Sequence, residues 1–326
     1  MINSLVISPY FLRILATLSL LFLYIANTEA VTLKEARQFY ATGEYAKAIE
    51  SCEKAIEDKQ FDSGWRLLLL RSYLVTGQLL QAKKLSETLL QDYKYRYNAE
   101  ALWLFHLSFE ANGESDKSKQ MLQIIMQFLE GQRGVSDEST IVFIGRALLK
   151  TATADPKQIK ENLYDRVLKS DPENREALLA VGELALAKRD FKLAGQTLTR
   201  AIGIYPEDAD LLYALAKAYS ESDPSQMEEP LHKAMFSNPD HIPSLLLQAH
   251  NQADAEQYET ANGILKAIFK INPHHPESWA LQASIHTVQN KSQEAKTARE
   301  NGLKFWKTNP HVDYEIGKKL SSKYLF

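Results

Sequence analysis

The sequence predicts an all-α protein built as a solenoid of helix-turn-helix repeats, and the spacing of its prolines and glycines carries this prediction. Four prolines recur at intervals of 34, 33 and 34 residues: Pro172, Pro206, Pro239 and Pro273. Proline lacks a backbone donor and disfavours helix in the residue before it, so each one separates two successive helices. A fixed period in this range indicates stacked repeats.

Glycines show the same period in the first part of the chain. Gly43, Gly77 and Gly113 lie 34 and 36 residues apart, where a tight turn between two helices is expected. Only 13 glycines and 11 prolines occur in 326 residues, which argues against β-sandwiches and low-complexity linkers. This length would ordinarily suggest two globular domains, but a repeat array grows without a central core.

Composition excludes several classes of function. Lys and Arg number 38 against 41 Asp and Glu, and the net charge of -3 provides no basic field for nucleic acid. Cys52 is the single cysteine, which excludes disulfides within the chain and cysteine zinc knuckles. Because Cys52 shares a helical stripe with Ile49 and Ile56, we expect it to pack in the core.

The first thirty residues have the layout of a secretory signal. An apolar run, Ile14 to Ile25, follows Arg13 and precedes Thr28-Glu29-Ala30, which favours cleavage after Ala30. The run is shorter than the roughly 20 residues that a spanning helix needs. An uncleaved signal anchor is the alternative, because residues 5–7 are also apolar. We therefore expect an exported protein, periplasmic or extracellular, that meets a membrane only through such an anchor.

Residues 175–206 contain one complete repeat. An apolar stripe precedes a turn at Asp190 and Phe191, and a second stripe follows the turn and ends before Pro206. The two stripes consist of Leu178, Val181, Gly182 and Ala185, and of Ala194, Leu198 and Ala201. This pattern predicts a helix, a turn, a second helix and a stop.

The unit resembles the tetratricopeptide repeat (TPR), with large apolar, small and aromatic residues on its first helix and alanines on its second. Other copies match through Trp279, Ala283 and Ala295, through Leu212, Ala216 and Tyr219, and through Gly43, Tyr45, Ala48, Ile49 and Ala55. The resemblance covers almost all of the chain after residue 30. It implies a right-handed superhelical solenoid of about eight repeats plus a final single helix.

The landmarks predict where each unit begins. The starts are expected near Glu29, Ser63, Ala99, Glu138, Arg175, Ala209, Ile242 and Pro276, with a last helix opening near Pro310. Glycines precede the fourth unit and residues 151–157 lengthen its internal turn, so we expect two sub-arrays. They are residues 31–130, with repeats 1–3, and residues 138–326, with repeats 4–8 and the terminal helix. In the sixth unit, Met227 and Pro230 predict a second helix that starts late.

The first helices of stacked repeats form a concave wall, and the residues on that wall are candidates for binding a partner. The helical period places there Arg37, Tyr40, Leu67, Arg71, Trp103, Leu107, Leu179, Glu183, Tyr213, Lys217, Leu246 and His250. Aromatic residues and arginines are typical of binding hot spots, so an extended peptide or an amphipathic helix is the expected ligand. Alternatively, Trp103 and Tyr213 only close contacts between repeats.

One subtype of the family is disfavoured. The resemblance implies that receptors of chaperone tails hold a terminal carboxylate with lysines and asparagines on successive first helices. The matching positions here carry Leu33, Arg37, Leu67, Arg71 and Trp103. Arg37 and Arg71 still suit an acidic partner.

The sequence contains no recognisable catalytic constellation. No pair of histidines flanks a glutamate at zinc-peptidase spacing, and no glycine-rich phosphate loop or serine elbow occurs. His241, His274 and His275 fall in connections between repeats and are interpreted as polar turn residues rather than metal ligands. Glu173 near Arg175 is interpreted as a solvated helix start. We therefore expect a non-catalytic scaffold with a protein or peptide partner and with no metal, cofactor, nucleic acid or small-molecule substrate.

The last residues support an alternative. Residues 309–326 resemble a segment of large secreted bacterial TPR proteins that continue into a peptidase-MA-like zinc metallopeptidase domain. The alternative function is therefore the N-terminal recognition portion of a larger secreted metallopeptidase whose catalytic domain is absent from this chain. A lone capping helix explains the same residues more simply.

Overall fold

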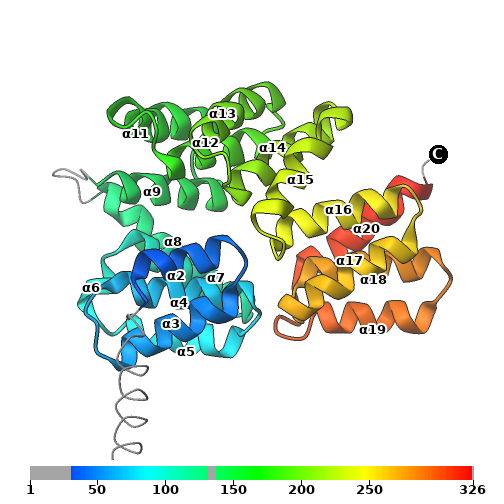
Figure 1. Ribbon diagram of the computed structural model, residues 1–326, viewed down its shortest axis with the longest axis horizontal. Helices are drawn as coiled ribbons and strands as arrows, with labels where there is room; N and C mark the ends of the chain where they lie inside the picture. The colour runs from blue at the N-terminus through cyan, green and yellow to red at the C-terminus, as the bar shows by residue number, and fades with distance from the viewer. Residues whose placement is uncertain (1–30, 131–136, 325–326) are drawn as a thin grey trace, which may run out of the picture.

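The computed structural model describes residues 31–130 and 137–324, and every regular element in these ranges is helical (Figure 1). The first helices of the repeats are α2 (Leu33–Ala41), α4 (Ser63–Val75), α7 (Ala99–Ala111), α9 (Glu138–Thr151), α12 (Arg175–Ala187), α14 (Ala209–Ser222), α16 (Ile242–Asp254) and α18 (Pro276–Val288). Their partners include α3 (Tyr45–Glu57), α5 (Leu79–Leu89), α8 (Ser115–Glu130), α13 (Phe191–Ile204), α15 (Glu228–Ser237), α17 (Tyr258–Ile271) and α19 (Ser292–Gly302). The last described helix is α20 (Pro310–Tyr324).

The starts of the first helices confirm the predicted spacing. From α4 onward these helices, and α20, begin at the predicted residues, whereas α2 begins at Leu33 and Glu29 lies outside the described residues. Side-chain oxygens at the starts accept backbone N–H bonds, which fixes where a helix begins. The capping residues are Asp62, Asn98, Asp137, Asn174 and Asp208. The predicted all-helical fold with paired helices is therefore confirmed.

The fourth repeat is irregular, as its sequence predicts. After α9, Ala152 adopts a left-handed backbone with φ +53°, and Asp155 caps α10 (Pro156–Ile159). A π-helical turn (Lys160–Tyr164) and α11 (Asp165–Ser170) complete its second helix, and the π-helical turn is not foreseen by the sequence pattern.

Two further features concern short helical segments outside the paired helices. A 3-10 turn (Pro224–Gln226) precedes α15, which confirms the late start of the second helix in the sixth repeat. A short helix that the sequence pattern does not predict, α6 (Tyr93–Arg96), lies between the second and third repeats.

The core runs continuously through the first half of the array. One cluster of buried apolar residues extends from Ala36 to Leu184 and includes residues of α7, α8 and α9. The division into sub-arrays at 131–137 stays a prediction. Cys52 is completely buried, as predicted, and burial raises the pKa of its thiol to about 12.

The array curves so strongly that its first three repeats contact its last three repeats (Figure 1). Tyr45, at the start of α3, accepts a 3.2 Å hydrogen bond from the Asn238 side chain and donates one of 3.4 Å to the Asp240 carbonyl. Gly43 lies so close to Asn238 that a Cβ on Gly43 would be 2.5 Å from its Oδ1. The first and sixth repeats are therefore in direct contact.

The same relationship recurs one repeat and two repeats later. Gly77 lies against the Asn272 side chain, and Gly113 lies against Trp306. We call these three glycine contacts, with the Tyr45 bonds, the end-to-end contact. It closes the concave side of the array.

Within residues 31–130 and 137–324, no helix combines the length and apolar character that crossing a bilayer requires. The signal expected in residues 1–30, with cleavage after Ala30, lies outside the described residues.

Candidate functional site

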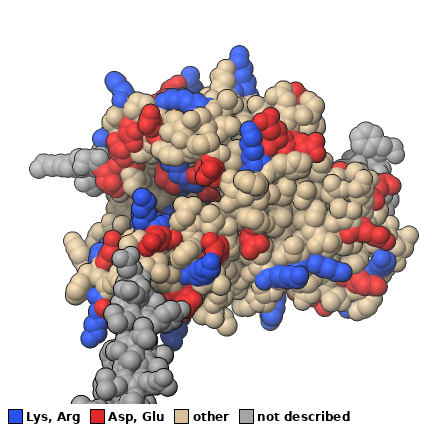
Figure 2. Space-filling view, viewed as in Figure 1, with Lys and Arg blue, Asp and Glu red and all other residues tan. Residues whose placement is uncertain are grey.

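A cavity of about 670 Å³ lies at the centre of the curved array. Residues of α2, α4, α7, α9, α12 and α14 line it, together with residues from the turn before α16. Its walls are thus built mainly from first helices, as expected for a concave face. Figure 2 shows acidic and basic side chains gathered around the hollow between the α9–α15 part and the α2–α7 part. We call it the central cavity.

Arg175 holds together the carboxylates on one wall of the central cavity. Its guanidinium lies 2.8 Å from Asp208 Oδ2, 2.6 Å from Asp210 Oδ2 and 2.6 Å from Glu176 Oε1. Asp208 is also the cap of α14, where it accepts a 3.1 Å bond from the Leu211 N–H. One arginine therefore ties the start of α12 to the start of α14.

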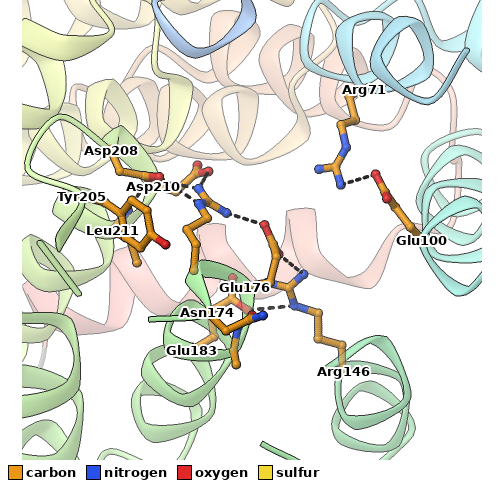
Figure 3. Close-up of polar contacts among 12 residues, drawn as sticks. Arg71, Glu100, Arg146, Asn174, Glu176, Glu183, Tyr205, Asp208, Asp210 and Leu211 are labelled. Atoms are coloured by element: carbon orange, nitrogen blue, oxygen red, sulfur yellow. Dashed lines mark hydrogen bonds and ion pairs between the residues drawn. The ribbon is translucent and has the colours of Figure 1, made fainter. Parts of the chain in front are cut away.

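Two further arginines form ion pairs of the same kind (Figure 3). Arg146 on α9 lies 3.0 Å from Glu176 Oε2 and 3.4 Å from Glu183 Oε2. On the opposite part of the array, Arg71 on α4 donates to Glu100 on α7 at 2.9 Å. These pairs join successive first helices, which fixes the positions of the charges on the wall.

Burial opposes ionisation of these carboxylates, and their partners offset it to different degrees. Desolvation raises the pKa of Asp210, but the His241 hydrogen bond and the Arg175 charge outweigh it and hold the pKa below its usual value. Glu176 has a lowered pKa because the charges of Arg146 and Arg175 outweigh its desolvation. For Glu183 desolvation prevails over Arg146, and its pKa is raised. Asp210 and Glu176 are therefore ionised at neutral pH.

Aromatic rings and a histidine complete the central cavity. Tyr40 meets Tyr45 edge to face, with ring centroids 5.4 Å apart. His241 contacts Asp210 Oδ1 through Nε2 at 3.2 Å and the Ser244 hydroxyl through Nδ1 at 2.7 Å. The site therefore offers aromatic area beside fixed charges.

A second cavity of about 410 Å³ lies between the later parts of α4 and α7 and the starts of α18 and α20. His274, His275, Phe305 and Trp306 line it with Glu110 and Lys150. The His274 and Phe305 rings lie 4.6 Å apart. Both cavities lie on the concave side of the array.

Several of the residues predicted from the sequence come together. Arg37, Tyr40, Leu67 and Arg71 line the central cavity, although Leu67 is almost fully buried. Leu107 lines the second cavity.

The other predicted residues make contacts within the protein. Trp103 packs against Phe143 on the first helix of the next repeat, with ring centroids 6.3 Å apart. Tyr213 meets the His241 ring at 5.8 Å, and Lys217 lies 3.5 Å from Glu221. Glu183 pairs with Arg146 as described, and the His250 carbonyl accepts a bond from Lys319 at 3.3 Å.

The sequence pattern did not single out Arg146, Glu176 or Asp210, and it gave His241 only as a polar turn residue. Glu100, Glu176 and Asp210 each occupy the second position of a first helix, and this recurrence is the signal that could have found them. Acids at helix starts are common because they complement the helix dipole, which hides the signal. Glu173 was interpreted as part of a solvated helix start and is exposed, whereas Arg175 beside it is surrounded by three carboxylates in the central cavity.

Of the histidines between repeats, His241 lies apart from the neighbouring pair His274 and His275. His241 lines the central cavity, whereas His274 and His275 line the second one. His275 contacts the Ser278 hydroxyl at 2.9 Å and Glu277 at 3.5 Å. Among the described residues, no three His, Cys, Asp or Glu side chains are placed to hold a metal ion.

Comparisons with known proteins agree with this architecture. Residues 161–219, from the fourth repeat to α14, match the family described as Tetratricopeptide repeat. The curated proteins contain no significant match to the chain. Among solved structures, the APC/C hetero-tetramer Cut9–Hcn1 is similar at 12% identity and a TM-score of 0.54, over 88% of this chain and 55% of that chain.

Two smaller solved proteins are also similar. TTC0263, described as a thermophilic TPR protein in Thermus thermophilus, shares 18% identity at a TM-score of 0.49, over 56% of this chain and 99% of that chain. YrrB, described as a TPR protein with an unusual peptide-binding site, shares 19% identity at a TM-score of 0.33, over 62% of this chain and 99% of its own.

The family match identifies the repeat, and the likeness to Cut9–Hcn1 shows the same fold over most of the chain. TPR domains bind proteins or peptides and are usually non-catalytic, and the comparisons identify no catalytic domain. Paired helices at the TPR period, a matching family and a matching fold lead to one conclusion: the chain contains a tetratricopeptide repeat match at residues 161–219 within an array of paired helices of the same period.

Proposed function

We propose that this protein is an exported, non-catalytic scaffold that binds an extended segment of a partner protein in its central cavity. The observation that carries the proposal is the cavity itself, which successive first helices line with arginines, carboxylates and tyrosines. Concave sites with aromatic area and a few fixed polar groups are where proteins bind ligands. The end-to-end contact closes the concave side, which favours an extended chain over a long helix laid into an open groove.

Tyr40 is suitable for testing this proposal, because it lines the central cavity. Random peptides of one fixed length, displayed on phage, are selected on the full chain. We expect the selected peptides to bind Tyr40→Leu at least about ten-fold more weakly, because buried aromatic contacts carry much of the binding energy.

Tyr97→Leu is the matched control, because Tyr97 is 59% exposed and does not line the cavity. It should bind the selected peptides like the unaltered chain. Equal affinity for all variants would contradict binding in the central cavity.

Export has its own test. The apolar run in residues 14–25 supports it, with the small residue Ala30 where a signal peptidase would cleave. The mass of the protein purified from fractionated cells should correspond to a chain that begins at Val31. A full-length mass in the membrane fraction would favour the signal anchor, and a full-length mass in the cytoplasm would exclude export.

A further inference from the structure

The charges that line the central cavity are unequal. Three arginines, Arg37, Arg71 and Arg175, face six carboxylates. The carboxylates are Asp62, Glu100, Glu176, Glu207, Asp208 and Asp210. With three positive and six negative charges, the lining carries a formal charge of -3 with His241 neutral, as large as that of the whole chain. The negative charge of the protein is therefore concentrated where a ligand would bind.

The excess of carboxylates over arginines lies on one wall of the central cavity. On the α2–α7 side, Arg37 and Arg71 balance Asp62 and Glu100. On the wall formed by residues 175–210, Arg175 is the one lining cation beside four carboxylates, and Arg146 also pairs with one of them, Glu176. Arg175 contacts three of them at 2.6 to 2.8 Å, so most of its N–H donors are already engaged by carboxylates of the protein.

Two carboxylates on the cavity lining have no cationic partner among the described residues. Asp62 caps α4 by accepting a 2.7 Å bond from the Gly64 N–H, and Glu207 makes no such bond. Asp210 and Glu176, whose pKa values are lowered although burial opposes ionisation, stay charged as well. The negative potential is thus a fixed property of the cavity lining at neutral pH.

Tyr40 adds a second kind of cation recognition. Its ring lines the same cavity, and the edge-to-face contact with Tyr45 holds its orientation. The face of an aromatic ring attracts a guanidinium or an ammonium group within about 6 Å. Carboxylates and a tyrosine face together suit a long basic side chain.

We propose that the partner segment is basic, and that a Lys or Arg side chain of this segment binds at the wall formed by residues 175–210. This inference rests on the proposed function and names its ligand. It reverses the expectation that Arg37 and Arg71 suit an acidic partner, because Glu100 occupies Arg71 and the carboxylates outnumber the arginines. Electrostatic complementarity then selects among partners.

The test uses the peptides selected by phage display and measures whether their affinity depends on positive charge. The peptides enriched on the full chain should contain Lys or Arg, and a synthetic peptide with these residues replaced by Gln should bind at least about ten-fold more weakly by calorimetry. Affinity should also fall as salt rises.

Two isosteric substitutions each remove one negative charge from the cavity lining with little effect on the fold. Asp62→Asn keeps a side-chain oxygen that caps α4, and Glu207→Gln breaks no described bond. The double variant should bind the basic peptide about five- to ten-fold more weakly. Glu57→Gln, an exposed carboxylate at the end of α3 and outside the cavity, is the matched control and should bind normally.

The outcomes separate the two proposals. Enrichment of acidic or uncharged peptides that still lose affinity in Tyr40→Leu would overturn the basic segment and leave the peptide-binding cavity standing. No enrichment, or enrichment that ignores Tyr40→Leu, would overturn both.

Discussion

Gly77, in the turn between α4 and α5, lies directly against the side chain of Asn272, in the turn that follows α17. A Cβ on Gly77 would be 2.8 Å from Asn272 Cγ and closer still to its Oδ1. The Asn272 side chain cannot easily move away, since its Oδ1 accepts a 2.9 Å bond from the His274 N–H. Because glycine has no side chain, these two residues, almost two hundred positions apart in the sequence, can lie in direct contact.

A left-handed backbone alone does not explain this glycine. Gly43, Gly77 and Gly113 have φ values of 86°, 70° and 72°, but Arg189 and Asn290 adopt 58° and 60° in other turns between paired helices. Those turns accept a Cβ at positive φ. The glycines therefore stand where the end-to-end contact needs close approach.

Gly77→Ala should consequently weaken the end-to-end contact. We expect a loss of about 2–4 kcal/mol in the free energy of unfolding, because the left-handed strain of about 1–2 kcal/mol is added to a steric clash. Small-angle scattering should show a larger radius of gyration. Urea unfolding measures the free energy.

Two variants separate the clash from the backbone strain. Asn290→Ala places alanine at a similar φ and should cost about 1 kcal/mol or less. Gly77→Ala combined with Asn272→Ala removes the atom that the new Cβ meets and should recover part of the loss. If the double variant is no more compact than Gly77→Ala, the close approach is not what the glycine provides.

The Tyr45 hydroxyl should stabilise the same contact through hydrogen bonds. Tyr45→Phe removes the bond from Asn238 and the bond to the Asp240 carbonyl, so the free energy of unfolding should fall by about 1–2 kcal/mol. Faster exchange of the amide hydrogens around Asp240 would locate the loss.

Tyr73→Phe provides the comparison. The Tyr73 hydroxyl bonds Glu53 at 2.6 Å within the first two repeats, so its loss should not increase exchange near Asp240. Equal exchange in both variants would mean that Tyr45 does not hold the ends together.

Helical glycines should respond oppositely according to what lies beside them. In α12, a Cβ on Gly182 would be 2.6 Å from Leu198 Cδ2, whereas Gly195 in α13 has nothing within 4 Å. Gly182→Ala should destabilise by about 1–3 kcal/mol through overpacking. Gly195→Ala should stabilise by about 0.5–1 kcal/mol because alanine is the better helix former. Chemical denaturation of both proteins measures the difference, and a gain in stability for Gly182→Ala would contradict the packing.

The fold followed from the sequence because local signals set it. Prolines at a fixed period and capping residues such as Asp62 and Asp208 place each helix, and neighbouring repeats then stack. The end-to-end contact could not be predicted in this way, because a small rotation at every repeat decides whether Gly43 reaches Asn238. The spacing of prolines and glycines does not give the rotation between neighbouring repeats accurately enough to predict this contact.

The candidate site was predicted only on its first-helix face. The helical period brought out Arg37, Tyr40 and Arg71, since all three follow from the packing stripe of a single repeat. Glu207 and His241 lie in or beside turns, where helical periodicity gives no direction for a side chain. Their approach to the cavity depends on the curvature of the array.

His250 should make stability depend on pH in a defined range. Burial first, and then the charge of Lys319, lowers the pKa of its imidazole from 6.5 to about 4; Lys217 and Lys318 add to this, and Asp254 opposes it. A folded-state pKa below the unfolded one means that folding favours the neutral ring. The contribution is therefore complete above about pH 6.5 and is lost as the pH falls toward about 4.

His250→Gln removes this titration. Between about pH 6.5 and 4, its free energy of unfolding should fall less than that of the unaltered chain, by an amount of order 1–3 kcal/mol. Urea unfolding at a series of pH values measures the two slopes. Lys319→Gln should reduce the fall only in part, because burial is the larger cause and remains. Parallel slopes for the unaltered chain and His250→Gln would show that the ring is not shielded as the structure describes.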